Sequence, residues 1–307
     1  LVPARRRTNR PRSEIRSVVV RMIQFGDYRL SLINDCSIVV DAGGAFGLVP
    51  RSLYRDLLPP DENNGVPMTQ HVLLIQTGTQ NIIVDSGYGD KLSDKQRAFM
   101  QLQRPNGGLV DALARVGLAP GDIDLVIDTH LHNDHCGGNT RFDEAGKPVA
   151  VFPNAEYVVQ RREYEDAMQP NERTRATYIL ANYEPLVASG QMRLLDGDVE
   201  IAPGIWGIVS PGHTPAHMSV RIERGGQHAA FVCDLASYAI HFERLGWMTA
   251  YDVEPLRTLE SKRVWQQWAL ETDALLIFPH DSVRPMGRLT EDEKGRRVVV
   301  KLEEPYA

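Results

Sequence analysis

Long apolar runs are missing from this chain of 307 residues, and none approaches the roughly 20 residues that a membrane-spanning helix needs. Cysteine is scarce as well, because three widely separated cysteines without a C-x-x-C pair indicate reduced thiols rather than a disulfide framework. The net charge is −6, so the chain lacks the excess of basic residues that binding to a nucleic acid requires. We therefore expect a cytoplasmic protein that binds neither a membrane nor a nucleic acid.

The first 17 residues differ in composition from the rest of the chain. They contain six arginines and a single acidic residue, Glu14, and we expect a flexible basic leader there. No apolar signal-peptide core follows, because Arg21 interrupts the run Val18–Val20, although an export signal upstream of this sequence stays open. Residues 18–307 are predicted to form one domain, as α/β and sandwich folds of this size often do.

Short apolar segments of β type alternate with polar connections along this domain. The pattern predicts strands at 28–33, 37–40, 71–76, 81–84, 125–128, 155–159, 192–195, 205–209, 218–222, 229–233 and 274–278. It predicts mainly helical segments at 91–116, 161–188 and 254–270, and a glycine-containing loop at 43–47. The strands fall into two clusters, which favours two β-rich halves packed together with helices outside.

The strongest chemical signal follows the strand predicted at 125–128, in the sequence DTHLHNDHCGGN. Residues two apart in extended backbone point to the same side, so His130 and His132 can converge on one ion. The turn that follows can direct Asp134 and His135 toward a second position. Imidazole and carboxylate groups are ligands of Zn²⁺ and related divalent ions, so this segment predicts a metal site.

Four protein ligands cannot fill two catalytic metal sites, so further ligands are expected beyond later strands. His213 follows the strand predicted at 205–209, Asp234 follows the run AFVC, and His280 follows LLIFP. Polar residues at strand ends are where a rigid scaffold carries function. The candidate ligands are therefore seven in number: His130, His132, Asp134, His135, His213, Asp234 and His280.

The order and spacing of these residues resemble the metallo-β-lactamase superfamily, from about residue 18 onwards. The shared features are H-x-H-x-D-H, a Gly-His-Thr segment, an aspartate after a strand and a late histidine. The resemblance implies a four-layer αββα sandwich, with two mixed β-sheets, outer helices and a site at one edge of the sheets. It implies that one ion is held by His130, His132 and His213. It implies that a second ion is held by Asp134, His135 and His280, and that the carboxylate of Asp234 bridges the two ions.

The same resemblance implies two divalent cations as cofactors, with zinc first and iron, manganese or cobalt as alternatives. No glutamate replaces His132, as it would in the di-iron flavoprotein branch. Position 234 holds no cysteine, unlike antibiotic-cleaving enzymes with a cysteine ligand. Cys233 is adjacent, but a strand residue there should point to the opposite face, so we expect it in the core.

Residues 47–50, 71–90 and 250–255 are similar to the branch that contains N-acyl-homoserine lactonases and methyl parathion hydrolase. Ala216 and Cys136 depart from that branch's usual residues without removing a ligand. We expect a hydrolase in which a hydroxide shared by two ions attacks a lactone or ester carbonyl, as in quorum-quenching lactonases. The main alternative is a phosphotriesterase or arylesterase of the methyl parathion hydrolase type; a thioester hydrolase and a non-catalytic binding module rank below it.

Two of the candidate ligands are also candidates for proton transfer, namely Asp134 and Asp234. Tyr238 resembles a tyrosine that some lactonases place near the substrate oxygen, and a packing role is the alternative. The expected partner is a small-molecule lactone or ester, and the sequence leaves a homodimer open.

Three further polar residues are predicted to lie around the ligands. Asp85 follows the strand predicted at 81–84 and is expected to orient a ligand histidine. His217 is expected to support the loop of His213, and His241 is expected to line the pocket.

Overall fold

The structure, a computed structural model, describes residues 21–105 and 107–302. The predictions for residues 1–17 and for Val18–Val20 lie outside the described residues. The strands are β1 (Arg21–Phe25), β2 (Tyr28–Asp41), β3 (Gly65–Gln76), β4 (Asn81–Val84), β5 (Leu125–Ile127), β6 (Thr140–Phe142), β7 (Pro148–Ala150), β8 (Glu156–Gln160), β9 (Met192–Leu195), β10 (Val199–Ala202), β11 (Ile205–Val209), β12 (Met218–Arg224), β13 (Gln227–Phe231), β14 (Leu275–Ile277), β15 (Met286–Glu291) and β16 (Arg297–Lys301).

Helices connect these strands and are mostly short. The α-helices are α1 (Ala42–Phe46), α2 (Arg51–Tyr54), α3 (Asp94–Phe99), α4 (Leu109–Arg115), α5 (Asn133–Cys136), α6 (Arg161–Met168), α7 (Glu184–Ala188), α8 (Ala239–Glu243) and α9 (Pro255–Thr272). Single 3-10 turns are η1 (Pro120–Asp122), η2 (Gly137–Asn139), η3 (Leu180–Asn182) and η4 (Cys233–Leu235).

Two mixed sheets lie at the centre of the molecule. The first has the strand order β1-β2-β3-β4-β5-β8-β9, and the second has the order β10-β11-β12-β13-β14-β15-β16. In the first sheet β4, β5, β8 and β9 run parallel, and in the second β13 and β14 do. The remaining neighbours in both sheets are antiparallel.

The central strands are apolar on both faces because each face is covered. Successive strand residues point to opposite sides of a sheet. In β4, Ile82 and Val84 lie in the core between the sheets, whereas Ile83 lies under the helices of the first sheet. In β13, Phe231 lies between the sheets and Ala230 lies under α9. Each sheet therefore separates two apolar cores.

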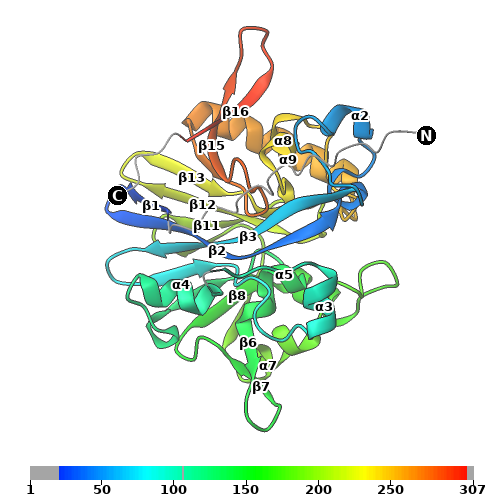
Figure 1. Cartoon of the computed structure of the whole chain (residues 1–307). Helices are drawn as coiled ribbons and strands as arrows, with labels where there is room; N and C mark the ends of the chain where they lie inside the picture. The colour runs from blue at the N-terminus through cyan, green and yellow to red at the C-terminus, as the bar shows by residue number, and fades with distance from the viewer. Residues whose placement is uncertain (1–20, 106, 303–307) are drawn as a thin grey trace, which may run out of the picture.

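Helices cover the outer face of each sheet (Figure 1). α4, α6 and α7 pack on the first sheet through Leu113, Ala167 and Leu186. α9 packs on the second sheet through Trp265 and Ala269. The layers therefore follow the order helix, sheet, sheet, helix, which confirms the αββα sandwich expected from the sequence.

The first expected strands and loop were wrong in detail. Ranges 28–33 and 37–40 form the single strand β2, whose pairing with β3 shifts register between Asn34 and Cys36. Most of the expected loop at 43–47 is helix α1, because Asp41 caps it by accepting a hydrogen bond from the Gly43 N–H at 2.7 Å.

The segments expected to be mainly helical, 91–116 and 161–188, each contain two short α-helices separated by non-helical connections. Between α3 and α4, Pro105 lacks an N–H, and Gly107 adopts a φ of 77° that a right-handed helix excludes. Between α6 and α7, Pro170 follows the end of α6. Strands β1, β6, β7, β10, β15 and β16 were not predicted.

Several strands end at one edge of the sandwich, where the candidate ligands begin. Asp85 follows β4, His130 lies beyond β5, and His213 lies beyond β11. Asp234 and His280 lie beyond β13 and β14. Ligands bind most often outside the carboxyl ends of strands in such sheets. Within the described part of the chain, no helix is long and apolar enough to cross a membrane.

Candidate metal centre

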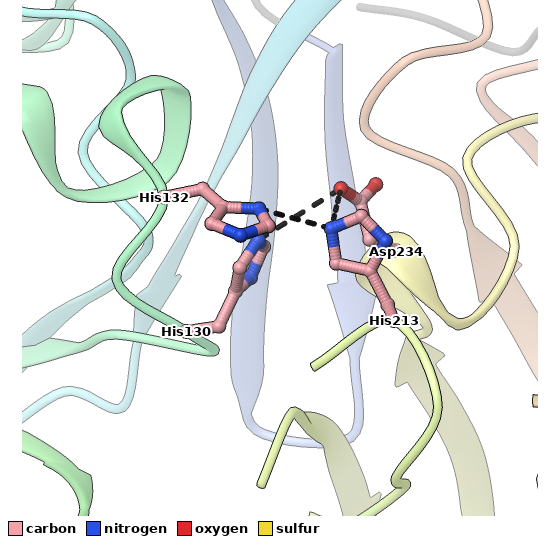
Figure 2. A group of neighbouring side chains, drawn as sticks. All are labelled: His130, His132, His213 and Asp234. Atoms are coloured by element: carbon pink, nitrogen blue, oxygen red, sulfur yellow. Dashed lines mark hydrogen bonds and ion pairs between the residues drawn. The ribbon is translucent and has the colours of Figure 1, made fainter. Parts of the chain in front are cut away.

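The seven predicted ligands lie in two groups that meet at one carboxylate. Ligand atoms within 4.8 Å of one another come from His130, His132, His213 and Asp234 in the first group, and from Asp134, His135 and His280 in the second. Figure 2 shows the side chains of the first group pointing toward one another, with His130 and His132 from one segment and His213 and Asp234 from two others.

Asp234 contacts histidines of both groups. Its Oδ2 lies 3.1 Å from His213 Nε2 and 3.8 Å from His130 Nε2. The same oxygen lies 3.4 Å from His135 Nε2, and Oδ1 lies 2.9 Å from His280 Nε2. Asp234 therefore lies between the two groups of candidate ligands.

The site is closed on most sides. His130, His135 and His280 are fully buried, and His132 and His213 are nearly so. Asp134 retains 19% of its side-chain exposure, more than the 8% of Asp234. The site consequently opens to solvent on the side of Asp134.

The outward ring nitrogens of three histidines face hydrogen-bond acceptors. The pairs are His135 Nδ1 with Asp85 Oδ2 at 2.8 Å, His213 Nδ1 with Asp252 Oδ1 at 3.0 Å, and His280 Nδ1 with Thr69 O at 3.0 Å. An acceptor there fixes the proton on Nδ1 and leaves the lone pair of Nε2 directed inward, as in metal-binding histidines generally.

The inward nitrogens fit a cation better than they fit one another. His135 Nε2 and His280 Nε2 lie 3.3 Å apart, although the outer nitrogen of each ring already faces a hydrogen-bond acceptor. His130 Nε2 is buried and has no hydrogen-bond partner among the described residues. Buried lone pairs without a donor are costly, and a divalent ion satisfies them. The donor set therefore fits a metal.

The charge states of His130, His132 and Asp234 agree with this fit. Burial, reinforced by His213, lowers the pKa of His132 to about 3, and burial lowers the pKa of His130 well below its usual range. Both rings are therefore neutral, the form that binds a metal. Burial opposes ionisation of Asp234, but His280 and His213 hold the pKa of its carboxyl well below the ordinary value.

His213 differs from these two histidines. Its burial opposes protonation, but Asp234 and Asp252 raise its pKa to about 10. A metal ion at this position therefore competes with a proton for the ring nitrogen.

Asp85 lies beside the ligand His135, in agreement with the role in orienting a histidine that the sequence indicated. Besides facing His135, its Oδ1 accepts hydrogen bonds from the N–H and the hydroxyl of Thr129, both at 2.9 Å. Thr129 Oγ1 in turn lies 3.1 Å from His130 Nδ1. One buried carboxylate is thus connected to a histidine of each group.

His217 lies behind the bridging carboxylate. Its Nε2 accepts a hydrogen bond from the Asp234 N–H at 3.2 Å, and its Nδ1 lies 2.9 Å from Ser210 Oγ. Burial, with His213 nearby, lowers the pKa of His217 to about 3, so the ring is neutral. It therefore links the backbone of Asp234 to the strand end that precedes His213.

Tyr238 and His241 lie in an apolar cluster beside the site. The Tyr238 hydroxyl donates to Pro67 O at 3.4 Å, and its ring stacks on Phe46 with 6.1 Å between centroids. The His241 ring meets Phe46 edge-on, and neither of its ring nitrogens has a partner among the described residues. Both side chains are 3% exposed or less, so a role in lining the pocket stays a prediction.

The expected orientation of Cys233 was wrong. β13 ends at Phe231, and Cys233 lies in η4 with a φ of 50° rather than in extended backbone. Its side chain is buried in the core, but the thiol lies 3.0 Å from Thr129 Oγ1 and 3.4 Å from Asp85 Oδ2. It therefore faces the groups that support the ligands, and not the opposite side of a strand.

Sequence reasoning missed two carboxylates that hold the site together. Asp252, beside His213, lay within a segment noted only for its family resemblance. Glu163 is fully buried and accepts hydrogen bonds from the Leu131 N–H at 3.0 Å and the Thr214 hydroxyl at 2.6 Å. It joins the two ligand loops across a long stretch of sequence, and no local motif marks it.

Known proteins are similar to this chain in sequence. Residues 65–280 match the model of the metallo-beta-lactamase superfamily. An N-acyl homoserine lactonase of Bacillus cereus is 26% identical over 261 residues, which is 82% of this chain and 92% of that protein. The N-acyl homoserine lactonase AttM of Azorhizobium caulinodans is 29% identical over 193 residues, which is 60% of this chain and 67% of that protein.

Solved structures give the same result. A probable metal-dependent hydrolase from Staphylococcus aureus is 30% identical, with a TM-score of 0.81 over 92% of this chain and 100% of that one. The dizinc quorum-quenching lactonase AidC, in complex with a product, shares the fold at 19% identity, with a TM-score of 0.75 over 93% of this chain and 98% of that one. This chain therefore belongs to the metallo-β-lactamase superfamily and is a hydrolase of that family.

Proposed function

We propose that this hydrolase is a dinuclear metal-dependent lactonase that opens the ring of N-acyl homoserine lactones. The carboxylate shared between two ligand groups carries the proposal, because Asp234 contacts histidines of both. Relatives named N-acyl homoserine lactonase that align with 82% of this chain support the substrate class.

In this proposal His130, His132 and His213 hold one divalent ion, Asp134, His135 and His280 hold the other, and Asp234 belongs to both. Bound there, the ions would lower the pKa of a water and polarise the lactone carbonyl. Zinc suits these nitrogen and oxygen donors, and iron, manganese and cobalt share the preference.

The chain's own groups would orient the ligands and move the proton. Asp85 and Asp252 hold His135 and His213 in single tautomers, so that no rearrangement is needed during turnover. Opening a lactone ring releases an alkoxide that needs a proton. Asp134 is the ligand carboxylate with the greater exposure, and it can pass a proton between solvent and the leaving oxygen.

A substrate panel on enzyme loaded with defined metals tests this function. The panel compares N-hexanoyl homoserine lactone, an aryl ester and paraoxon, with His132→Ala as the inactive control. We expect the lactone to have the highest kcat/KM. A lactone rate near zero beside rapid paraoxon or ester hydrolysis would instead establish the phosphotriesterase or arylesterase alternative.

Metal analysis separates an enzyme from a non-catalytic binding module. After purification from metal-supplemented medium, we expect about two transition-metal ions per chain. Fewer than one ion per chain, together with inactivity across the panel, would favour the binding module.

A further inference from the structure

The segment 250–253 is fixed in place by hydrogen bonds to two separate segments of the chain. The Ala250 N–H donates to Gly44 O of α1 at 2.9 Å. Arg173, from the connection after α6, donates to Ala250 O at 2.7 Å and to Asp252 O at 3.3 Å. A segment bonded on two sides presents its side chains in one fixed position, which is what substrate recognition requires.

Tyr251 lies in the middle of this segment, and its phenol lacks an intramolecular bond. The residue is 45% exposed, and its hydroxyl has no hydrogen-bond partner within the described ranges. The hydroxyl rests against Gly44, where an added Cβ would collide with it. The absence of a side chain at Gly44 therefore determines where the phenol lies.

The segment that carries this phenol contacts a ligand of the metal centre, because the Val253 N–H donates to His213 O at 3.2 Å and Asp252 Oδ1 lies 3.0 Å from His213 Nδ1. Partial burial, together with repulsion from Asp134, Asp41 and Asp234, raises the pKa of Tyr251 above its ordinary value. Asp134 is the more exposed of the two ligand carboxylates. The phenol therefore stays protonated near neutral pH and is available as a hydrogen-bond donor at the entrance.

Tyr238, the tyrosine indicated by the sequence, offers no such donor. It is 3% exposed, its hydroxyl already donates to Pro67 O, and its ring is stacked on Phe46. A bond from Tyr238 to a substrate would require breaking that hydrogen bond inside a packed apolar cluster.

We propose that Tyr251 is a specificity-determining residue whose phenol donates a hydrogen bond to the amide carbonyl of an N-acylated lactone. The inference rests on the proposed function. The reacting ring carbonyl must lie at the buried ligands, so the exocyclic amide extends toward the opening, where Tyr251 lies. The donor therefore distinguishes N-acylated lactones from lactones that have only an alkyl substituent.

Comparison of two lactones on the metal-loaded enzyme tests this assignment. Tyr251→Phe should lower kcat/KM for N-hexanoyl homoserine lactone by about five- to tenfold, mainly through KM, as expected for one neutral hydrogen bond. For a γ-lactone with an alkyl chain and no amide, the value should stay within about twofold. Metal content should equal that of the wild type.

Three further variants sharpen the comparison. Gly44→Ala should reproduce the amide-dependent loss, because the new methyl group displaces the phenol. Tyr164→Phe removes a phenol on the outer helix α6 and should change neither lactone. Tyr238→Phe tests the competing tyrosine and should not alter the ratio between the two lactones. If Gly44→Ala fails to fold, Tyr251→Phe alone still tests the proposal, because it removes only the phenolic oxygen and leaves the ring in place.

The outcomes separate this inference from the proposed function. A wild type that hydrolyses both lactones, with a Tyr251→Phe variant that keeps the same ratio between them, would overturn the inference alone. A ratio that shifts with Tyr238→Phe instead would return the role to Tyr238. A wild type inert toward N-acylated lactones would overturn the proposed function and this inference together.

Discussion

Replacing Asp85 with asparagine tests how the outer hydrogen bonds sustain the metal centre. The carboxylate is fully buried and surrounded by donors. Oδ1 accepts from the Thr129 N–H and hydroxyl, and Oδ2 faces His135 Nδ1 at 2.8 Å. An asparagine of the same shape carries one acceptor oxygen and one donor NH₂ group. In either orientation, its NH₂ group therefore meets another donor.

The expected effect follows from this clash. If the NH₂ group faces Thr129, a buried N–H loses its acceptor, at a cost of about 1–3 kcal/mol in the free energy of unfolding. If it faces His135, the ring must move its proton to Nε2, the nitrogen directed at the metal. Loss of such an outer partner typically weakens metal binding by about 10- to 100-fold. Asp85→Asn should therefore release one of two ions more readily and lower stability.

Asp252→Asn is the matched control because its surroundings differ in one respect. Asp252 Oδ1 faces His213 Nδ1 and accepts from the Thr249 hydroxyl at 2.9 Å, while Oδ2 has no partner among the described residues. The asparagine oxygen can keep both contacts, with its NH₂ group at the unpartnered position. Its effect on metal affinity should therefore be smaller than that of Asp85→Asn.

Competition with a chromophoric chelator measures both affinities, and thermal melts of metal-free protein measure stability separately. Asp85→Asn should shift one of two release steps by about 10- to 100-fold. Equal shifts in the two variants, or a larger shift in Asp252→Asn, would refute the idea that an asparagine NH₂ group meets a second donor at position 85 but not at position 252.

Three other predictions follow from the same contacts. His132→Ala and Asp234→Asn should each lower turnover by orders of magnitude with an unchanged far-UV circular dichroism spectrum; near-normal rates in either would contradict the ligand assignment. Chelation should lower Tm, since one ion at 100 times its Kd stabilises the fold by about 2.7 kcal/mol, and a melt that ignores the chelator would count against a metal site. Glu163→Ala should lower the free energy of unfolding by about 2 kcal/mol or more, because the Leu131 N–H and Thr214 hydroxyl lose a buried acceptor; urea unfolding measures this, and an unchanged midpoint would refute it.

The candidate ligands could be located from the sequence because each lies at a position with a local signal. The alternation after β5 and the strand ends before Asp234 and His280 are visible in the chain itself. Their hydrogen-bond partners are not, since His280 meets Thr69 and His213 meets Asp252 only after distant segments have packed. Helix lengths were overestimated for a related reason, because polar stretches with helical spacing do not show where tertiary contacts end a helix.

Two residues at the site adopt backbone that local propensity would not select. Asp85 has a φ of 61° and Cys233 a φ of 50°, and each follows a buried strand. A left-handed residue with a side chain costs about 1–2 kcal/mol, so surrounding contacts must offset it. At Asp85 the offset comes from bonds to Thr129 and His135. Extending the strand through Cys233 therefore gave the wrong direction for its thiol, and the turn that replaces the strand is what precedes the bridging Asp234. Backbone strain and ligand geometry are consequently linked at positions 85 and 233. A glycine at either position would relieve the backbone strain, but it would also remove a side-chain contact that supports the ligands.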